Sequence, residues 1–450
     1  MADPVSRDVP LPGERAGDVI DRYTLVEPLG EGGMGTVWLA EQSEPVKRRV
    51  ALKIVKLGMD TREVVVRFEV ERQALALMDH PSIAKVLDGG STASGRPYFV
   101  MELVDGEPIT SYCDRERLEL RERLGLFVRV CDAVQHAHHK GVIHRDLKPS
   151  NVLVATVDGN PTPKVIDFGI AKATSAELTE STLRTEVGQI VGTPEYMAPE
   201  QALTSGADVD TRADVYSLGV LLYELLTGSK TFDVRRALQK GIDELLRQIR
   251  EVDPDKPSTR VSGLGETATQ IAASRKSDTT TLGRQLRGDL DWVVMRALEK
   301  ERERRYDTPA ALAEDVRRYL ANEPVDAAPP SAAYRWRKFV QRRTKTVVAA
   351  AAMLFLLVAG VVGTSFGLVR ALDEKRRADG EAENAKAAAA EAQRARSRAE
   401  SVVKFVVETL ESGNAMTAGG RQDKTILEAM EGAMEDIESG RFAGDPEVEA

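Results

Sequence analysis

Short apolar runs separated by glycine-rich or charged turns characterise the start of the chain. Three such runs, at residues 23–26, 36–40 and 50–55, have the length and flanking turns typical of strands. Residues 62–78 then change to helical spacing, and His80 with Pro81 ends that segment. Two further strand-like runs follow at residues 83–87 and 97–103. The pattern predicts an N-terminal sheet with one main helix.

Helical spacing dominates later in the chain. A helix is predicted over residues 118–140, and the chain is mainly helical from 208 to 320. Short strands are predicted at residues 142–154 and 164–166, around polar turns. Residues 252–288 show no sustained period, which predicts a long surface insertion. A sheet-rich part followed by a helix-rich part predicts an α+β fold with two lobes and a site in the cleft between them.

Residues 347–369 form an uncharged apolar stretch of 23 residues. As a helix it would span roughly 35 Å, enough to cross a hydrocarbon core of ~30 Å. A buried globular helix is the alternative, but such a helix is seldom apolar on every face for six turns. Basic residues alone precede the stretch at 335–345, whereas basic and acidic residues are mixed after it at 370–377. The positive-inside rule therefore predicts a single-pass protein of the cell (inner) membrane, with residues 1–345 in the cytoplasm and the C-terminal segment outside.

The segments around the predicted span have distinct compositions. Residues 1–20 are predicted to be a disordered tail, and residues 323–346 a basic juxtamembrane linker. Residues 371–411 predict an Ala-rich helix with alanines at 4,3 spacing, for which a coiled coil and a solvated single helix are both open. Residues 412–450 predict a further helical segment that resembles the start of a larger, truncated array.

Small residues recur at one face of the span. Ala359, Gly363 and Gly367 follow the small-xxx-small spacing that lets two membrane helices approach closely. This spacing predicts a homodimer, although it also arises by chance in Ala-rich and Gly-rich sequences.

Composition narrows the function classes. Lys plus Arg is 62 and Asp plus Glu is 71, which gives a net charge of −9 and argues against binding to nucleic acid by bulk charge. Cys113 and Cys131 are the two cysteines, with neither a CxxC nor a Cys/His cluster, so the sequence supports neither a disulfide framework nor a zinc site.

A glycine-rich turn lies between two predicted strands at residues 30–35, with the sequence G-E-G-G-M-G. Glycines at this spacing let a hairpin fold closely over phosphates, with backbone N–H groups free to approach the oxygens. A dinucleotide-binding fold would need this loop to enter a helix, but residues 36–40 predict a strand. The turn by itself is a weak indication of nucleotide binding.

Lys53 lies inside an apolar strand, where an unpaired ammonium group is costly to bury. Glu71, on the helix that follows, is a candidate anionic partner, and the pair would then face nucleotide phosphates. A surface lysine that extends its head group to water is the alternative.

Residues 144–151, with the sequence H-R-D-L-K-P-S-N, are far more specific. Within six residues they supply a carboxylate that can accept a hydroxyl proton, a lysine that can neutralise phosphate and an amide oxygen that can hold Mg²⁺. A D-F-G sequence at 167–169 adds a carboxylate suited to metal chelation, and A-P-E follows at 198–200.

With these five motifs in order, residues 23–320 resemble the eukaryotic-like (Hanks-type) serine/threonine protein kinases, in the layout of a bacterial transmembrane receptor kinase. The resemblance implies a bilobal kinase domain over residues 21–322. Its N-lobe would cover residues 21–104 and its C-lobe residues 105–322. One transmembrane helix and a helical C-terminal segment would follow.

The resemblance also implies residue roles. The residues implied in catalysis are Asp146, Lys148, Lys53 and Glu71. Those implied in ATP binding are Leu29, Gly30, Glu31, Gly32, Gly33, Met34, Gly35, Val37, Ala51, Lys53, Met101, Glu102 and Val104. Asn151 and Asp167 would hold Mg²⁺, with Mn²⁺ as the alternative ion. ATP and protein substrates are the implied partners, with no nucleic acid.

Further residues are implied in structure and regulation. The structural set is His144, Arg145, Phe168, Gly169, Thr193, Glu200, Asp214 and Arg305, with Asp214 bracing the catalytic loop and Glu200 pairing with Arg305. Arg145 implies neutralisation by a phosphorylated activation loop. The candidate phosphosites are Thr179, Ser181, Thr182 and Thr185. Lys148 and the sequence G-T-P-E-Y at 192–196 resemble serine/threonine rather than tyrosine kinases.

Two other function classes remain to be weighed. A pseudokinase scaffold would lack one of the five central residues, Lys53, Glu71, Asp146, Asn151 and Asp167, but all are present. In the other reading, the C-terminal region is the sensor or docking module and the kinase is its output. The sequence favours a membrane-anchored kinase that transfers the ATP γ-phosphate to Ser and Thr hydroxyls and is activated by autophosphorylation.

Overall fold

The computed structural model describes residues 14–32, 35–55, 73, 75, 77–168, 194–202, 209–417 and 431 of the chain. Its contacts divide the chain into two units, Met1–Arg343 and Thr344–Ala450. Each unit is described by itself below.

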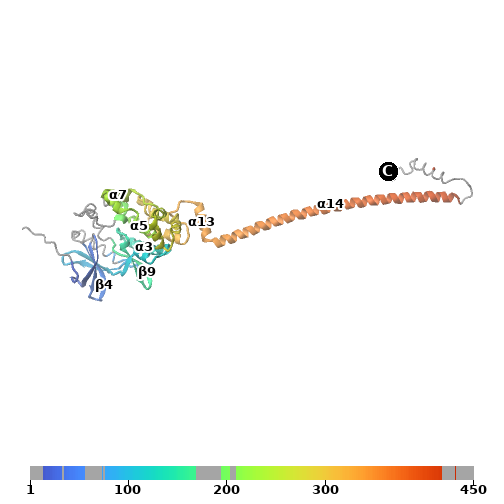
Figure 1. Cartoon of the computed structure of the whole chain (residues 1–450). Coiled ribbons are helices and arrows are strands. Elements are labelled where there is room, and N and C mark those ends of the chain that lie inside the picture. The colour runs from blue at the N-terminus through green and yellow to red at the C-terminus, as the bar shows by residue number, and fades with distance from the viewer. Residues whose placement is uncertain are drawn as a thin grey trace, which may run out of the picture. The chain divides into compact units, whose positions relative to one another are not determined.

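An antiparallel sheet forms the N-terminal part of the first unit (Figure 1). Its order is β1-β2-β3-β4-β6-β5. The strands are β1 (Val19–Ile20), β2 (Tyr23–Gly32), β3 (Gly35–Gln42), β4 (Arg48–Val55), β5 (Val86–Ser91) and β6 (Pro97–Glu102). Alternating side chains such as Tyr23 and Leu25 on β2 and Val50, Leu52 and Ile54 on β4 are buried in one cluster. These alternating positions therefore form the inward face of the sheet.

Two expectations in this part need comment. The run predicted as a strand at residues 83–87 becomes β5 only from Val86 onward. Ile83 instead forms a single parallel bridge with Val165, outside the sheet. Of the helix predicted over residues 62–78, Gln73 and Leu75 are described as helical, whereas Leu77 lies in a turn and Met78 in neither a helix nor a strand. The other residues of that helix lie outside the described residues.

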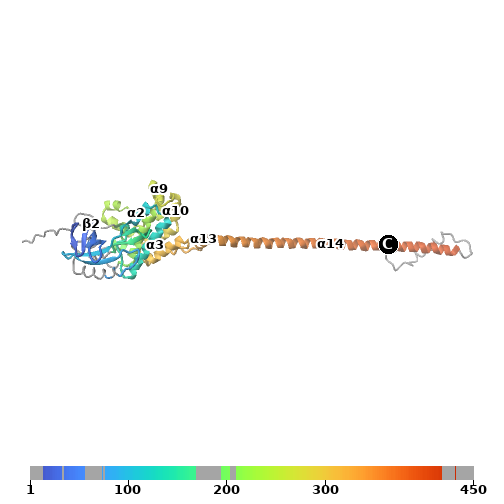
Figure 2. The same cartoon turned by 90° about the horizontal axis from the view of Figure 1, so that it is seen from below.

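Helices form most of the second lobe, as Figures 1 and 2 show. They are α2 (Ile109–Arg115), α3 (Leu120–His139), α5 (Arg212–Thr227), α6 (Val234–Gln239), α7 (Ile242–Glu251), α8 (Pro257–Gly263), α9 (Glu266–Ala273), α10 (Thr279–Leu286), α11 (Asp289–Ala297) and α12 (Pro309–Leu320). The first residue of α3 follows a capping box between Glu119 and Glu122, which satisfies backbone N–H groups at that end. Apolar residues of α3 and α5 lie in one large buried core, so these two helices form the centre of the lobe.

Residues 252–288 are not the surface insertion that the sequence predicted. They form α8, α9 and α10, and Val261, Ile271, Leu282 and Leu286 from these helices lie in the main core. Each helix is about two turns long, so none shows enough apolar positions to establish a helical period over the whole segment. Polar linkers between them diluted the pattern further.

A three-stranded sheet in the order β7-β8-β9 lies against α2 and α3. Its strands are β7 (Gly106–Pro108), β8 (Val152–Val157) and β9 (Asn160–Val165). The strand predicted over residues 142–154 is therefore mostly wrong, because β8 begins only at Val152 and the polar residues before it form a loop. That loop carries the H-R-D-L-K-P-S-N sequence.

The basic segment 323–346 was expected to be a linker, but it contains a packed helix, α13 (Ala332–Arg342). Tyr334 and Lys338, one helical turn apart, are both buried against the lobe. Lys338 forms an ion pair with buried Asp289, and the Tyr334 hydroxyl donates to Asp289 Oδ1 at 3.0 Å. The Tyr334 ring also meets Trp292 edge to face, with 5.4 Å between the ring centroids. These contacts explain why residues up to Arg343 belong to the first unit.

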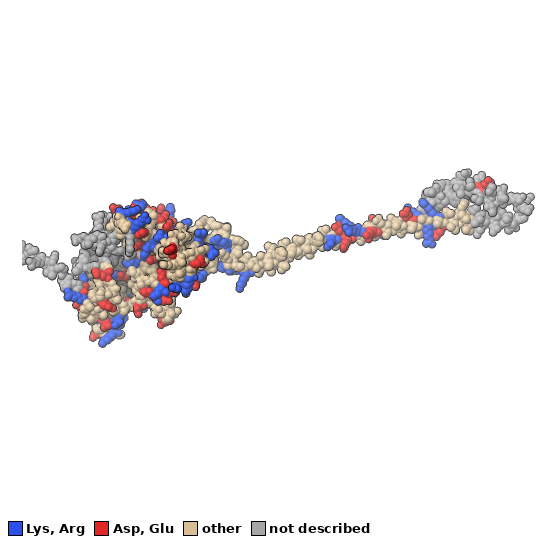
Figure 3. All heavy atoms as spheres, viewed as in Figure 1, with Lys and Arg blue, Asp and Glu red and all other residues tan. Residues whose placement is uncertain are grey.

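The second unit contains α14 (Thr344–Thr417), a helix of 74 residues. It includes the single candidate membrane span found among the described residues, and none of the side chains in its most apolar window is buried. Figure 3 shows an uncharged stretch of this helix followed by charges of both signs. A buried core helix, the alternative for residues 347–369, is inconsistent with this exposure.

Replacing Lys338 by Met should destabilise the first unit, because it leaves the Asp289 carboxylate buried beside no cation. We expect the free energy of unfolding to fall by about 3–5 kcal/mol, measured by thermal unfolding of the full chain in detergent. The double variant Lys338→Met/Asp289→Asn should recover most of that loss. Arg304→Gln, in an exposed ion pair with Glu301, is the control and should change stability little. Equal effects of Lys338→Met and Arg304→Gln would contradict the docking of α13.

Candidate active site

The glycine-rich turn connects β2 and β3. Gly30 lies opposite Val37 and Gly32 opposite Gly35 in the register of the two strands. A Cβ atom on Gly35 would lie 2.1 Å from the Ile54 carbonyl oxygen, so only glycine allows β4 to pass this closely. Gly33 and Met34, at the tip of the turn, lie outside the described residues. The described part is a hairpin of two strands rather than the strand-to-helix turn of a dinucleotide fold.

Lys53 lies on β4, opposite Val37 of β3 and Phe99 of β6. Its ammonium group forms an ion pair with the carboxylate of Asp167, and the lysine side chain is only 14% exposed. The cost of burying the lysine is therefore offset by an anion from the other lobe. Glu71, the partner implied by the sequence, lies outside the described residues.

The loop before β8 brings three polar groups together. Lys148 Nζ lies 2.8 Å from Asp146 Oδ2. The Asn151 amide nitrogen donates to Asp146 twice, to the backbone oxygen at 2.8 Å and to Oδ2 at 3.2 Å. A short 3-10 turn, Pro149–Asn151, positions the asparagine for this contact. The side chains of Lys148 and Asn151, two and five residues after Asp146, thus meet around its carboxylate.

Asp214, in the first turn of α5, holds this loop through hydrogen bonds to its backbone. Its carboxylate accepts from the backbone N–H of His144 and of Arg145, both at 2.8 Å. His138 Nε2, at the end of α3, lies 2.7 Å from the same carboxylate. Burial by itself would raise the pKa of Asp214, but the hydrogen bonds from His138 and His144 lower that pKa below its usual value. The resemblance implied the role of Asp214, whereas nothing in the sequence indicated that His138 supports it.

Two residues of the candidate site have strained backbones. Arg145 and Asp167 both have φ of 63°, the left-handed region that costs a non-glycine residue of order 1 kcal/mol or more. The hydrogen bond from Arg145 N–H to Asp214 and the ion pair of Asp167 with Lys53 hold these conformations. Such strain places both side chains where unstrained backbone would not.

His144 and Phe168 connect the loop to the segment that carries Asp167. Their ring centroids are 4.7 Å apart, and His144 Nε2 lies 3.1 Å from the Ile166 carbonyl oxygen. Complete burial lowers the pKa of His144, so the ring is neutral near pH 7. Leu75 and Phe168 lie in the same core cluster, with Val86 packed against it. Phe168 thus connects the loop residue His144 to the main core.

Two contacts involve the short turn Pro199–Ala202. Arg305, fully buried, donates to both carboxylate oxygens of Glu200 at 2.7 and 2.8 Å, the pairing that the resemblance implied. Gln201, the next residue, donates to the backbone oxygen of Arg145 at 3.0 Å. A glutamine in a polar loop gives no sequence signal for this bond, so the sequence analysis did not single it out.

Three further residues implied in ATP binding lie on β4 and β6. Ala51 lies opposite Met101, and Glu102 lies at the end of β6. Lys164, on β9, donates to both carboxylate oxygens of Glu102 at 2.9 and 3.0 Å. This buried lysine was missed by the sequence analysis, because its partner lies 62 residues away in the chain. The pair joins the two lobes beside Met101.

The donor set fits a hard divalent cation that shares its ligands with phosphates. Asn151 directs its amide nitrogen at Asp146, which leaves the amide oxygen for another partner, and Asp167 adds a carboxylate. Mg²⁺ commonly takes one or two protein oxygens and completes its shell with phosphates and water. No cluster of three or more His, Cys, Asp or Glu occurs within the part of the chain that the structure describes, so a cage made wholly of such residues is not seen there.

Several predicted site residues lie outside the described residues. They are Glu71, Gly33, Met34, Gly169, Thr193 and the phosphosites Thr179, Ser181, Thr182 and Thr185. Their roles stay predictions.

The chain is similar to known proteins over about two thirds of its length. The family model described as "Protein kinase domain" matches residues 23–311. Serine/threonine-protein kinase Pkn1 of Myxococcus xanthus is 38% identical over 304 residues, which cover 67% of this chain and 38% of Pkn1. Serine/threonine-protein kinase PknB of Mycobacterium tuberculosis is 36% identical over 313 residues, covering 68% of this chain and 44% of PknB. The chain thus spans less than half the length of these two relatives.

A solved structure of the PknI kinase domain from Mycobacterium tuberculosis covers 68% of this chain and 99% of its own, with 26% identity and a TM-score of 0.49.

Replacing Asp214 by Asn should lower the free energy of unfolding by about 2–4 kcal/mol at pH 7, because the amide keeps one acceptor oxygen but sets an NH₂ group against a backbone N–H. Thermal unfolding of the full chain in detergent measures the loss. The lowered pKa of Asp214 means that its stabilisation is present above the usual carboxyl pKa and disappears as the pH falls through the native pKa. The difference between wild type and variant should therefore shrink in acid. Asp307→Asn, at an exposed side chain, is the control, and an Asp214→Asn chain as stable as this control would contradict the bracing role.

Proposed function

This chain belongs to the protein kinase family, and we propose that it is an active serine/threonine kinase that transfers the γ-phosphate of ATP to Ser and Thr hydroxyls of proteins. The observation that carries the proposal is the convergence of Lys148 and Asn151 on Asp146, together with the ion pair between Lys53 and Asp167. A scaffold without catalysis has no need of this set.

Each residue then has a role in the transfer. Asp146 accepts the proton of the substrate hydroxyl. The hydroxyl oxygen then bonds to the γ-phosphorus, and the bond between that phosphorus and the departing ADP oxygen breaks. Lys148, 2.8 Å from Asp146, neutralises charge on the moving phosphoryl group. Lys53 contacts the α- and β-phosphates under the glycine-rich hairpin. Asn151 and Asp167 would hold Mg²⁺, or Mn²⁺ in its place, and the ion would neutralise phosphate charge.

Regulation by autophosphorylation follows from Arg145. This arginine precedes the catalytic aspartate and has a strained backbone fixed by Asp214. A phosphate on Thr179, Ser181, Thr182 or Thr185 would supply the anion that such a cation binds. Two chains that associate through Ala359, Gly363 and Gly367 would be able to phosphorylate each other. Among the described residues, none lies within 4 Å of a Cβ atom added at Gly363 or Gly367, which leaves this face open to a second helix.

Anchoring in the inner membrane completes the proposal. The uncharged part of α14 supports one span, and the basic residues before it support a cytoplasmic kinase domain with the C-terminal segment outside. ATP is available on the cytoplasmic side, which agrees with this orientation.

Asp146→Asn should lower phosphate transfer from MgATP at least about 100-fold, because the amide accepts no proton. The measurement is phosphate incorporation into a generic protein substrate by the full chain, with phosphosite mapping over residues 179–185. Asp158→Asn, at the exposed turn between β8 and β9, is the matched control and should keep wild-type activity. Nucleotide binding should survive in both variants.

The same assay separates the alternatives. Wild-type chains mixed with Asp146→Asn chains should phosphorylate the inactive partner within residues 179–185 if activation occurs between two chains. A wild-type chain that binds ATP but transfers no phosphate, alone or in membranes, would contradict the kinase proposal and favour a scaffold.

The orientation is tested by protease digestion of intact spheroplasts. Protease should remove residues beyond 370 and spare residues 1–345. Leu357→Arg with Val361→Arg should release the chain from the membrane, because each arginine costs roughly 3 kcal/mol at the centre of a span. Val402→Arg with Val406→Arg, the same change farther along α14, should leave the chain anchored. Digestion of the kinase domain in intact spheroplasts would reverse the proposed orientation.

A further inference from the structure

Helix α13 has one face docked on the lobe and another face in solvent. Tyr334 and Lys338 form the docked face through Asp289. Trp336 and Phe339 project from the other side and are 65% and 42% exposed. Their rings stack with centroids 5.6 Å apart and planes inclined by 25°. A fixed helix thus presents two stacked aromatic side chains to its surroundings.

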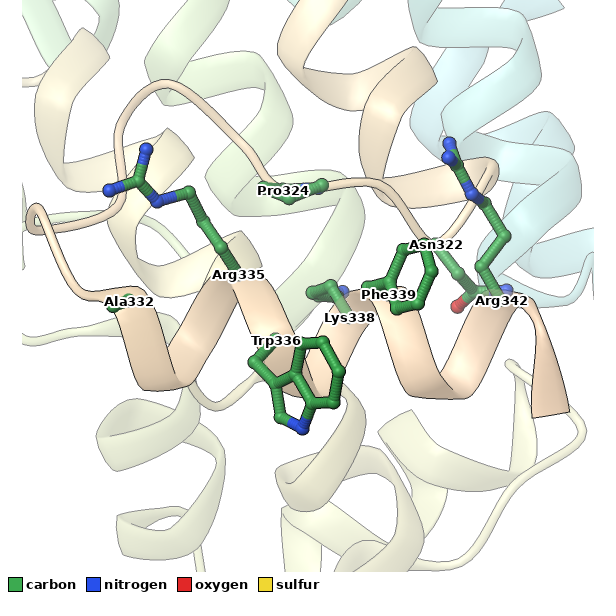
Figure 4. Close-up of a pocket in the computed structure, with 8 residues that line it drawn as sticks. All are labelled: Asn322, Pro324, Ala332, Arg335, Trp336, Lys338, Phe339 and Arg342. Atoms are coloured by element: carbon green, nitrogen blue, oxygen red, sulfur yellow. The ribbon is translucent and has the colours of Figure 1, made fainter. Parts of the chain in front are cut away.

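These aromatic side chains line an open groove of about 510 Å³ (Figure 4). Asn322 and Pro324, from the loop after α12, form one wall of the groove, and α13 forms the other. Arg335 and Arg342 lie toward its two ends. The groove therefore combines apolar surface with guanidinium groups, which suits a ligand that has both apolar and anionic parts.

The charged residues between 327 and 345 are all basic. The sequence has no acidic residue between Asp326 and Asp373, whereas six basic residues lie at positions 335–345. Asp289 neutralises Lys338, and Glu323 forms an ion pair with Arg342. The other four, Arg335, Arg337, Arg343 and Lys345, are exposed. The exposed side of the segment is thus cationic beside the aromatic pair.

We propose that the exposed face of α13 binds anionic phospholipid headgroups at the surface of the membrane that the chain spans. The inference rests on the proposed anchoring, because the uncharged stretch begins at residue 347, only eight residues after Phe339. Tryptophan prefers the headgroup level of a bilayer, where the ring meets apolar surface and its N–H meets water. Arginines bind lipid phosphates through paired hydrogen bonds and through the negative potential of the leaflet.

Because the opposite face of α13 is docked on the helical lobe, the lipid contact would also position that lobe. Because the Lys338–Asp289 pair and Tyr334 fix α13 on the helical lobe, headgroups bound to Trp336 and Arg335 hold the lobe itself at the bilayer rather than a free linker. The four exposed basic residues give about 1 kcal/mol each near an anionic surface, so binding should depend on lipid charge and weaken in salt.

The test uses the full chain reconstituted in bilayers whose lipids carry bromine near the headgroup, which quenches nearby tryptophan. The chain has three tryptophans, Trp38, Trp292 and Trp336, and none lies in the span. In bilayers of phosphatidylserine and phosphatidylcholine we expect quenching of roughly a third of the emission. Trp336→Phe should abolish the quenching, whereas Trp38→Phe, the matched control in the sheet, should retain it.

Lipid charge is tested with paired variants. Arg335→Gln with Arg343→Gln should reduce quenching in the phosphatidylserine bilayers to the level seen with phosphatidylcholine alone. Arg247→Gln with Arg304→Gln removes the same charge from exposed positions elsewhere on the lobe and should change nothing.

Resistance of the reconstituted chain to extraction by alkaline carbonate is measured in the same samples. This measurement distinguishes a failure of the proposed anchoring from a failure of the proposed lipid contact. A chain that carbonate extracts would overturn the anchoring, and the lipid contact with it. A chain that stays inserted while Trp336 is not quenched would overturn the lipid contact alone. Quenching that is equal in phosphatidylcholine and phosphatidylserine bilayers, or that is replaced by crosslinking between Trp336 faces of two chains, would overturn it as well.

Discussion

The active arrangement depends on one buried carboxylate. Asp214 accepts backbone hydrogen bonds from His144 and Arg145 and lies beside His138, so a single side chain orients the loop that carries the candidate catalytic groups. A buried charge is stable only if it is fully paired, and here the three partners come from two elements, α3 and the loop. The strained backbone of Arg145 persists because this pairing opposes its relaxation.

Ion pairs between distant segments connect this loop to the rest of the lobes. Lys53 meets Asp167 across the cleft, Lys164 meets Glu102 at the strand end, and Arg305 meets Glu200 in the helical lobe. Each pair joins residues that lie far apart in the sequence, with separations of 114, 62 and 105 residues. The chemistry of phosphate transfer depends chiefly on positioning and charge, and these pairs fix both.

The docked helix α13 extends the same principle toward the membrane. Its buried Lys338–Asp289 pair makes the juxtamembrane segment part of the kinase unit, and its exposed face is basic and aromatic. Under the proposed anchoring and lipid contact, a change at the bilayer surface would act on a helix that is packed against the helical lobe, which a flexible linker would not allow.

The sequence determined the local features: the strands of the sheet, α3, the uncharged stretch and every motif around Asp146, because period, turn residues and short spacings are readable along the chain. It could not show α8, α9 and α10, since each is too short to establish a period. Nor could it show that Lys338 meets Asp289, or that His138, Lys164 and Gln201 support the cleft. Those contacts join residues that only folding brings together. The residue type alone does not distinguish a buried lysine or histidine from one exposed to water.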